Sequence, residues 1–455
     1  MKSIRTAAAL TAVGALALGA LTACATEPAV DPNAPVTLKV AIDAGLEQGA
    51  IDAFDARVDQ FEDKYPNISV ERQEYNWTGT TFAAELAGGT IPDVFTVPFT
   101  DGRGLIERGQ LADISGIVAD LPYAEEFNPN VALAGEDAEG NMWAVPIAAY
   151  GQGLHYNRAL FEAAGLDPDS PPTTWDEVRE AAKAIADETD AAGYAQMTSS
   201  NTGGWILTTL DYALGGRLEE VDGEEATSTI DTPEVAEALG LLHDMRWDDN
   251  SMGSNFLYDW GTINQDFAAG RIGMYVSGGG NYGSLVTQNA MNPDDYGVTV
   301  LPLADGGDAG VLGGGTLAAV SAKADAATQA AAVKWIDFYY IEKLTDKAAA
   351  QADAKALFDA DAPVSAPTLP VFDKALYDEN LTWVDEYINV PVEQMTPYTD
   401  NIFSQPLIPE PTKSTQEIYA LLDPVVQAVL TDKNADIEKL LAEAQASAQA
   451  IIDRG

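Results

Sequence analysis

The stretch Asn141-Met-Trp-Ala-Val-Pro-Ile-Ala-Ala-Tyr-Gly-Gln-Gly-Leu-His-Tyr-Asn157 decides the fold of this chain. Trp143 to Ile147 form a short apolar strand that contains Pro146. Proline has no backbone N–H, so this strand must lie at the edge of a sheet or be leaving its sheet. A second apolar run follows at 154–156. We therefore expect the chain to cross from one layer to another near residues 147–153.

Two helices are predicted directly after this stretch. Asn157 is a suitable N-cap for the first helix, and Gly165 is a suitable residue to end it. Beyond a proline-rich break, Thr174 and Glu177 have the spacing of a capping box. One face of the second helix should be buried, and it consists of Val178, Ala181, Ala182 and Ile185.

These motifs resemble the extracellular solute-binding proteins of ATP-driven (ABC) importers, in particular the sugar-binding family that includes the maltodextrin-binding proteins. The residues that carry the resemblance are Trp143-Ala-Val-Pro146, Leu154-His-Tyr-Asn157, Leu160-Phe161, Ala164-Gly-Leu166 and Pro172-Thr-Thr-Trp-Asp-Glu177. His155 departs from the pattern, because an aromatic residue is commoner there. The resemblance implies an α/β, two-lobe, type II periplasmic-binding-protein-like fold with a ligand cleft between the lobes.

The resemblance also implies how the chain is divided. Lobe 1 is expected to comprise 36–147 and 311–350, and lobe 2 to comprise 148–310 and 351–455. Crossing segments near 147–153 and 303–313 would then join the lobes.

The N-terminus has the pattern of an export signal. Lys2 and Arg5 precede an apolar run that is too short for a confident membrane span, and the only cysteine, Cys24, follows small residues. The ending Leu21-Thr-Ala-Cys24 resembles the lipobox of bacterial lipoproteins. This predicts a signal peptide at 1–23, a lipid on Cys24, a tether at 24–35 and a location on the outer face of the cell membrane. The alternative is an ordinary signal with an accidental cysteine.

The chain is strongly acidic. It has 71 Asp and Glu against 24 Lys and Arg, which gives a formal net charge of −47. Such a surface repels nucleic acid, and it favours a neutral or cationic ligand at long range. The excess can equally be a solvated surface that keeps the protein soluble.

The predicted first lobe begins with a strand, a helix and a second strand, and ligands of open α/β sheets bind in loops beyond the strand ends. Asp43 and Glu47 lie in the first of these loops and Trp77 follows the second strand, so all three are predicted to contact ligand. Asp43 could instead cap the helix, and Trp77 could instead fill the core. The resemblance adds Phe99, Thr100 and Asp101, which follow a Gly-x-x-Pro-Asp-Val strand of the family type.

Further ligand contacts are predicted in the crossing segment and in the second lobe, where aromatic and amide groups are frequent. These residues are Tyr150, Trp205, Trp260, Gly280, Asn281, Tyr282 and Trp383. The run Gly278-Gly-Gly-Asn-Tyr-Gly283 also matches a dinucleotide-binding spacing, but it lacks the opening strand-helix-strand context. We interpret its glycines as permitting a close backbone approach to a ligand or a neighbouring loop.

A binding protein is favoured over an enzyme. Nucleophile elbows, P-loops and zinc-protease motifs are absent from the sequence, and it has two histidines. We therefore predict no catalytic residues, no metal and no cofactor, although a glycosidase with two carboxylates is not excluded by composition.

Aromatic faces stack on sugars, and amides and carboxylates bind hydroxyl groups, so the predicted ligand is a carbohydrate, most simply an oligosaccharide. A polyamine, peptide or other cationic solute is the alternative, because aromatic cages also bind cations. The expected partners are ABC permease subunits and the membrane, through the lipid on Cys24. A monomer that binds no nucleic acid is expected.

Overall fold

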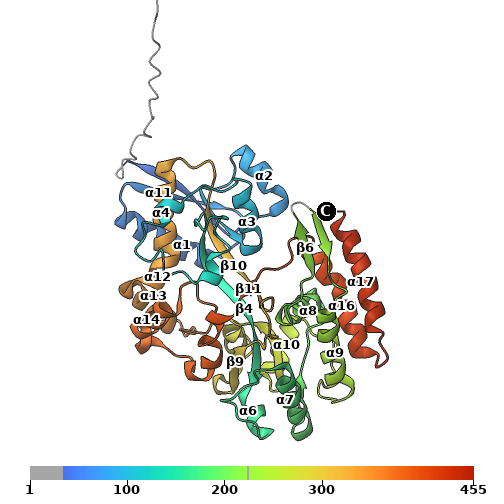
Figure 1. The fold of residues 1–455 in the computed structure, drawn as a ribbon. Helices are drawn as coiled ribbons and strands as arrows, with labels where there is room; N and C mark the ends of the chain where they lie inside the picture. Colours follow the sequence, from blue (N-terminus) through green and yellow to red (C-terminus); the bar gives the residue numbers. More distant parts are fainter. Residues whose placement is uncertain (1–33, 223–224, 455) are drawn as a thin grey trace, which may run out of the picture.

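The computed structural model describes residues 34–222 and 225–454, and Figure 1 shows their arrangement. The predicted signal peptide, Cys24 and most of the predicted tether lie outside these residues. Within them, no helix combines the length and the apolar character that a membrane crossing requires.

One mixed sheet runs through the described part of the molecule in the order β2-β1-β3-β10-β4-β8-β5, with β11 beside β10 and β9 beside β4. Strands β1, β2 and β3 are parallel, whereas β10 is antiparallel to both β3 and β4. A separate hairpin consists of β6 and β7. The strands are β1 (Val36–Ile42), β2 (Ile68–Glu74), β3 (Val94–Pro98), β4 (Val145–Asn157), β5 (Ala192–Tyr194), β6 (Glu219–Asp222), β7 (Glu225–Ser228), β8 (Ile272–Gly278), β9 (Tyr296–Val300), β10 (Val311–Val320) and β11 (Leu407–Ile408).

Helices cover this sheet in two groups. One group surrounds β1 to β3 at the top of Figure 1, and the other surrounds β5 and β8 below it. The helices are α1 (Gln48–Lys64), α2 (Gly79–Gly88), α3 (Phe99–Glu107), α4 (Ser115–Val118), α5 (Pro129–Ala132), α6 (Arg158–Ala163), α7 (Trp175–Glu188), α8 (Thr202–Ala213), α9 (Pro233–Trp247), α10 (Trp260–Ala268), α11 (Ala326–Ile336), α12 (Glu342–Thr345), α13 (Lys347–Asp359), α14 (Lys374–Val384), α15 (Thr396–Thr399), α16 (Thr415–Thr431) and α17 (Ile437–Ile452). Short π or 3-10 turns are η1 (Ser284–Gln288), η2 (Pro293–Asp295), η3 (Asp337–Ile341), η4 (Asp385–Tyr387), η5 (Val392–Met395) and η6 (Ile402–Ser404).

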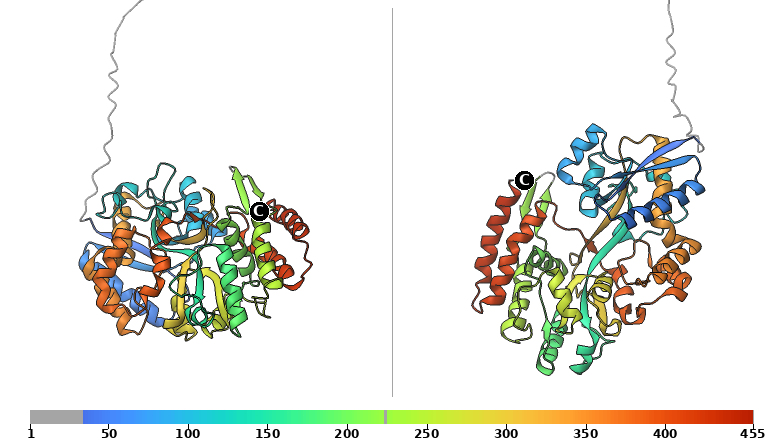
Figure 2. Two further views of the ribbon diagram at one scale, coloured as in Figure 1. Left: turned by 60° about the horizontal axis from the view of Figure 1, so that its bottom comes forward. Right: turned by 180° about the vertical axis from the view of Figure 1, so that it is seen from behind.

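Strands β4 and β10 connect the two groups, as the view from behind in Figure 2 also shows. The first half of β4 pairs with β10, and its second half pairs with β8 and β9. The two apolar runs predicted around Pro146 and at 154–156 are therefore one continuous strand of 13 residues. Pro146 pairs with Leu317 of β10, next to a register shift in that strand. In this part of β4 the partner strand is β10, so Pro146 lies at an edge of the sheet, as predicted.

The local predictions after β4 are also confirmed. Asn157 accepts a hydrogen bond from the backbone N–H of Leu160 at 3.0 Å and caps α6. Thr174 and Glu177 form the predicted capping box of α7. Its predicted inner face, Val178, Ala181, Ala182 and Ile185, is buried.

Ring contacts join one segment of the predicted second lobe to the predicted first lobe. Phe372, assigned above to lobe 2, stacks on Phe127 with ring centroids 4.7 Å apart and meets Tyr123 edge-on. Both partners belong to 36–147, so the part of the chain around Phe372 contacts the first lobe. The boundary at residue 350 stays a prediction.

Candidate functional site

We call the helix group around β1 to β3, with those strands, the first half of the molecule, and the group around β5 and β8 the second half. A cavity of about 530 Å³ lies between these two halves. From the first half it is lined by α3 and α5, and from the second by Val221 of β6 and by the chain that follows β11. Gly313 of β10 and Leu407 of β11 also line it. We call it the cleft cavity, and its lining residues are Phe99, Thr100, Asp101, Arg103, Gly104, Glu107, Arg108, Asn130, Leu133, Ala134, Val221, Gly313, Leu407, Pro409, Thr412 and Lys413.

The position of α3 follows from the parallel strands. Strand β3 ends at Pro98 and α3 begins with Phe99, so the first turn of α3 lies at the carboxyl edge of the sheet, where such folds bind ligands. Gly315 makes room for it, since a Cβ there would come 2.6 Å from the Phe99 ring. Gly313 similarly admits Leu407, which a Cβ would approach to 2.1 Å.

The charges around the cleft cavity differ from those of the whole chain. Arg103, Arg108 and Lys413 line it together with the carboxylates Asp101 and Glu107, so cations outnumber acids there. Burial raises the pKa of Asp101, while a hydrogen bond from Thr100 and the charge of Arg108 act in the opposite direction. The cavity therefore does not share the acidic excess of the molecular surface.

A second hollow, of about 280 Å³, opens beside the N-terminus of α8. We call it the α8 pocket. Its lining combines aromatic rings with amide, hydroxyl and carboxyl groups: Tyr150, Ser200, Asn201, Thr202, Trp205, Glu410, Gln416 and Tyr419. Pro409 lines the cleft cavity and the next residue, Glu410, lines the α8 pocket, so both hollows border this segment.

The loop at the start of α8 is held in an unusual conformation. Ser200 and Asn201 both have positive φ, 59° and 68°, which costs free energy for residues with a Cβ. The Asp423 carboxylate fixes this turn by accepting hydrogen bonds from the backbone N–H groups of Asn201 at 2.8 Å and Gly204 at 3.0 Å. The Asn201 side chain donates to Gln416 Oε1 at 3.1 Å. The polar wall of the α8 pocket is therefore preorganised.

Glu410 is the acidic group of the α8 pocket. Burial raises its pKa, and a hydrogen bond of 3.3 Å from the Tyr419 hydroxyl partly offsets this effect. Burial and the charge of Glu410 together raise the pKa of Tyr150. Both tyrosines therefore stay protonated at neutral pH and present hydroxyl groups, while Glu410 offers an oxygen acceptor.

The structure brings five of the predicted ligand-binding residues to these hollows. Phe99, Thr100 and Asp101 line the cleft cavity, and Tyr150 and Trp205 line the α8 pocket. Whether they contact a ligand stays a prediction.

The other first-half predictions are placed elsewhere. Asp43 and Glu47 are exposed and line neither hollow. Glu47 precedes α1 in the N-cap position without a side-chain cap, so the alternative of Asp43 as the helix cap is wrong. The Trp77 ring is half-buried and packs near Phe82, with ring centroids 6.3 Å apart.

Two predicted contacts in the second half belong to the core. Asn281 is 6% exposed, and its amide donates to Asn264 Oδ1 at 2.8 Å and to the Tyr275 hydroxyl at 2.7 Å. Tyr282 is 1% exposed and meets Tyr296 edge-on. The Asn281 amide has its hydrogen-bond partners within the fold and the Tyr282 side chain is buried, and neither residue lines the cleft cavity or the α8 pocket.

Three further predicted residues also lie away from both hollows. Gly280 is exposed near Thr368, which a Cβ would approach to 3.4 Å. Trp260 is 40% exposed on the first turn of α10, and Trp383 packs against a small apolar cluster around Val384. Trp260 and Trp383 carry the same indole ring as Trp205, but they lie outside the two hollows.

Several lining residues were not predicted, above all Glu410, Gln416 and Tyr419 and the cations of α3. The only local signal was Pro409-Glu-Pro411, an acid fixed between two prolines at the end of the irregular segment. In the described part of the chain, no group of three or more His, Cys, Asp or Glu side chains is placed to hold a metal ion.

The chain matches one protein family over a long continuous stretch. Residues 44–345 match the model of the bacterial extracellular solute-binding proteins, and the chain belongs to that family. This is the family that the sequence motifs predicted. The members of this family are extracellular solute-binding proteins. At the level of the family, this agrees with the predicted extracytoplasmic location and with the prediction of a binding protein.

Particular relatives place the chain within this class. It is 26% identical over 301 residues to the sn-glycerol-3-phosphate-binding periplasmic protein UgpB of Agrobacterium fabrum, which covers 62% of this chain and 65% of that protein. Its fold is similar to the cyclic α-maltosyl-1,6-maltose binding protein of Arthrobacter globiformis, with a TM-score of 0.68, 24% identity, and 92% and 100% of the two chains covered. UgpB of Mycobacterium tuberculosis in complex with glycerophosphocholine gives a TM-score of 0.63 at 20% identity, covering 92% and 98%. The type II two-lobe fold predicted above is therefore confirmed.

Proposed function

We propose that this protein is the substrate-binding lipoprotein of an ABC importer, and that it captures a carbohydrate, in particular an oligosaccharide, by closing its two lobes. The observation that carries this function is the cleft cavity, because it is lined by residues from both halves and by Gly313 of β10. A solute in such a cavity contacts both halves at once only when they approach each other. It therefore stabilises the closed form by its differential affinity.

The chemistry of the α8 pocket favours a sugar. Trp205 and Tyr150 offer rings, and Asn201, Thr202 and Glu410 offer hydrogen-bonding groups in the same small space. Rings match the C–H faces of pyranose units, and the polar groups match their hydroxyls. Because the cleft cavity and the α8 pocket border the same segment at Pro409 and Glu410, we expect a ligand of several sugar units rather than a monosaccharide. The Arthrobacter globiformis protein of similar fold is named as a cyclic α-maltosyl-1,6-maltose binding protein.

A glycerophosphate-type ligand is a second candidate, and the cations of the cleft cavity favour it. Arg103, Arg108 and Lys413 come together there although Lys and Arg are scarce in the chain. Guanidinium groups bind phosphate through paired hydrogen bonds. UgpB relatives are named for glycerol-3-phosphate and glycerophosphocholine. The same three cations weaken the polyamine or cationic-solute alternative, because they would repel such a ligand at the cleft.

Delivery completes the proposed function. A lipid on Cys24 would hold the protein at the outer face of the cell membrane, where the closed, loaded form would dock as a monomer on the permease subunits. The lipobox sequence and the family support this step.

A thermal-shift screen tests the ligand class. The purified protein is heated with maltodextrins of increasing length, glycerol-3-phosphate, glycerophosphocholine, peptides and polyamines. A ligand at 100 times its dissociation constant should raise stability by about 2.7 kcal/mol. Stabilisation by one glycan series supports the carbohydrate, and stabilisation by the phosphate compounds alone replaces it with the second candidate. Stabilisation only by polyamines or peptides refutes both.

Two tryptophans then test the position of the site. Trp205 lines the α8 pocket, whereas Trp260 is exposed outside it, and both were predicted as ligand contacts. Trp205→Ala should weaken binding of the ligand found in the screen by about 1–3 kcal/mol. Trp260→Ala is the matched control and should leave affinity unchanged. Equal losses, or a loss with Trp260→Ala alone, would place the site elsewhere.

A further inference from the structure

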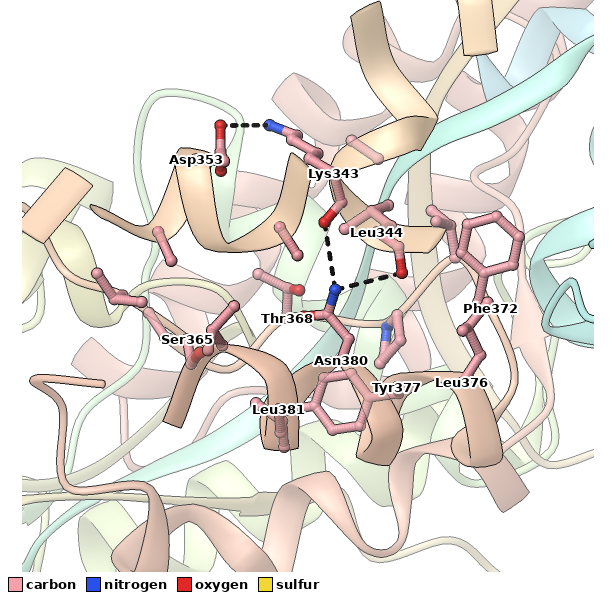
Figure 3. A pocket seen from close by; sticks show the side chains of 18 of the residues that line it. Lys343, Leu344, Asp353, Ser365, Thr368, Phe372, Leu376, Tyr377, Asn380 and Leu381 are labelled. Carbon is pink, nitrogen blue, oxygen red and sulfur yellow. Dashed lines mark hydrogen bonds and ion pairs between the residues drawn. The ribbon is translucent and has the colours of Figure 1, made fainter. Parts of the chain in front are cut away.

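A third cavity, of about 430 Å³, lies on the other side of β4 from the proposed ligand site. Its walls are α12, α13, α14 and the segment 363–372, and it shares no lining residue with the cleft cavity or the α8 pocket. Figure 3 shows it from close by, with α13 above and α14 below. The lining residues that shape it most are Leu344, Ala354, Leu369, Tyr377, Asn380 and Leu381.

This cavity touches the strand that joins the two halves. Ile147, Ala148 and Ala149 of β4 line it. Ala149 bridges to Leu369 on the cavity side and pairs with Gly315 of β10 on the other side. A molecule in the cavity therefore contacts the connecting strand directly, within the segment where the sequence predicts the chain to bend.

The space exists because α13 supplies small side chains. Its inward residues Ala350 and Ala354 are buried, and with Val364 and Val384 they form an apolar cluster separate from the main core. Leu357, which also lines the cavity, and Phe358 of the same helix stay 39% and 45% exposed. The cavity therefore offers a mouth open to solvent and an apolar wall that a ligand can cover.

The walls are fixed in place by hydrogen bonds. Asn389 accepts from the backbone N–H of Val364 at 2.8 Å and donates to the carbonyl of Ala362 at 2.9 Å. Asn380 donates to the carbonyls of Lys343 and Leu344, both at 3.2 Å, as the dashed lines in Figure 3 show. These bonds hold the segment 362–364 and join α14 to α12. The cavity is therefore preformed, as small-molecule sites usually are.

The polar groups define what the cavity can accept. Its two charged lining residues, Lys343 and Asp353, pair with each other at 3.9 Å, so it presents no unpaired charge. The two carbonyl contacts of Asn380 use its NH₂ group and leave its side-chain oxygen as an acceptor. Ser365, Thr368 and Tyr377 contribute hydroxyl groups, and the remaining lining is mostly leucine, alanine, proline and valine. A neutral, ring-containing molecule with one hydroxyl group fits this chemistry.

We propose that this cavity is a second small-molecule site, which binds a neutral, largely apolar ring compound that carries a hydroxyl group, and that its occupation stiffens β4 at Ile147 to Ala149. Binding there does not depend on which solute the cleft takes. If the occupant changes the affinity of the cleft for its solute by some factor, the solute must change the affinity of this cavity for its occupant by the same factor.

The binding test uses 2-naphthol as a fluorescent probe, titrated into the purified protein. Saturable binding at one site is expected. Ala354→Leu fills the cavity and should weaken binding at least tenfold. Ala356→Leu makes the same change at an exposed position of α13 and should leave affinity unchanged. If Ala354→Leu fails to fold by circular dichroism, Ala350→Leu fills the same wall one turn earlier. Absence of saturable binding, or equal affinity in the filled variant and the control, refutes the site.

The second measurement is hydrogen exchange of the β4 amides with and without 2-naphthol. Slower exchange in peptides that cover 145–151 is expected in the natural protein and in Ala356→Leu, but not in Ala354→Leu. Saturable binding without any change in these peptides would refute the stiffening of β4. Because neither readout uses a cleft ligand, failure here leaves the proposed transport function untouched.

Discussion

The most direct quantitative test concerns Asp211, a carboxyl group enclosed in the second half of the molecule. It lies on α8 with 0% exposure, and neither of its oxygens has a hydrogen-bond partner in the described structure. Gly216 closes against it, since a Cβ there would come 1.9 Å from Oδ1. Burial, assisted by the charge of Glu234, raises the pKa of Asp211 to about 8, although Arg217 opposes the shift.

The sign of the pH dependence follows from this shift. The folded protein keeps a proton on Asp211 that the unfolded chain releases above about pH 4. The free energy of unfolding therefore falls as pH rises from about 4 to about 8, by about 1.4 kcal/mol per pH unit from this one group. Between pH 5 and pH 7 the loss amounts to about 2.7 kcal/mol.

Asp211→Asn removes the titration and keeps the shape of the side chain. The free energy of unfolding of this variant should gain about 2.7 kcal/mol on the natural protein between pH 5 and pH 7. Urea unfolding of both proteins, followed by tryptophan fluorescence at pH 5, 6 and 7, measures this gain, and all other ionisable groups cancel in the difference. A difference between the two proteins that stays constant with pH would show that Asp211 is ionised in the fold and would refute the reasoning.

Three further predictions concern the connecting strand and the α8 pocket. Burial lowers the pKa of His155 to about 4, so in a His243→Asn background its ring protons should show no titration by NMR between pH 8 and pH 5.5; a midpoint near 6.5 would contradict this. Asp423→Ala removes the bonds that hold the start of α8, and should lower both the urea stability, by about 1–3 kcal/mol, and the affinity for the cleft ligand; affinity unchanged in a destabilised protein would separate that turn from binding. Burial raises the pKa of Glu410, so at acidic pH its side chain is neutral, as a glutamine is. Glu410→Gln should therefore bind the same ligand at acidic pH within about threefold of the natural protein, because one hydrogen bond of ordinary strength is retained. Glu410→Ala should lose more, and equal affinity of the two variants by calorimetry would exclude Glu410 from the site.

The parts of the fold that sequence predicted are those set by neighbouring residues. The capping box of Thr174 and Glu177, the cap at Asn157 and the edge position of Pro146 all depend on chemistry within a few residues. Residues 326–344 have an amphipathic pattern that predicts a helix, and the structure has helix there, but η3 interrupts it with a π turn between α11 and α12.

The site was less predictable because it is assembled from distant segments. Glu410 and Tyr419 reach the α8 pocket only through the return of the chain along β11 and α16, far from Trp205 in sequence. Trp205 and Trp260 are alike as residues and were predicted alike. Only the folded structure shows that one lines a pocket and the other faces solvent.

The burial of two predicted contacts in the glycine-rich loop has the same cause. Asn281 and Tyr282 follow β8 at the connecting region, where side chains near a cleft were expected. The Asn281 amide instead donates hydrogen bonds to Asn264 and Tyr275, and the Tyr282 ring packs edge-on against Tyr296. A polar residue in a loop gives no indication in sequence of whether its partner is a ligand or the fold itself.

The shared strands have a consequence for how the molecule comes apart. Strand β4 pairs with β10 in its first half and with β8 and β9 in its second half, so one strand completes the sheet on both sides of the connecting region. Removing one half would strip partner strands from the other and expose unpaired sheet edges. We therefore expect the two halves to melt as one cooperative unit.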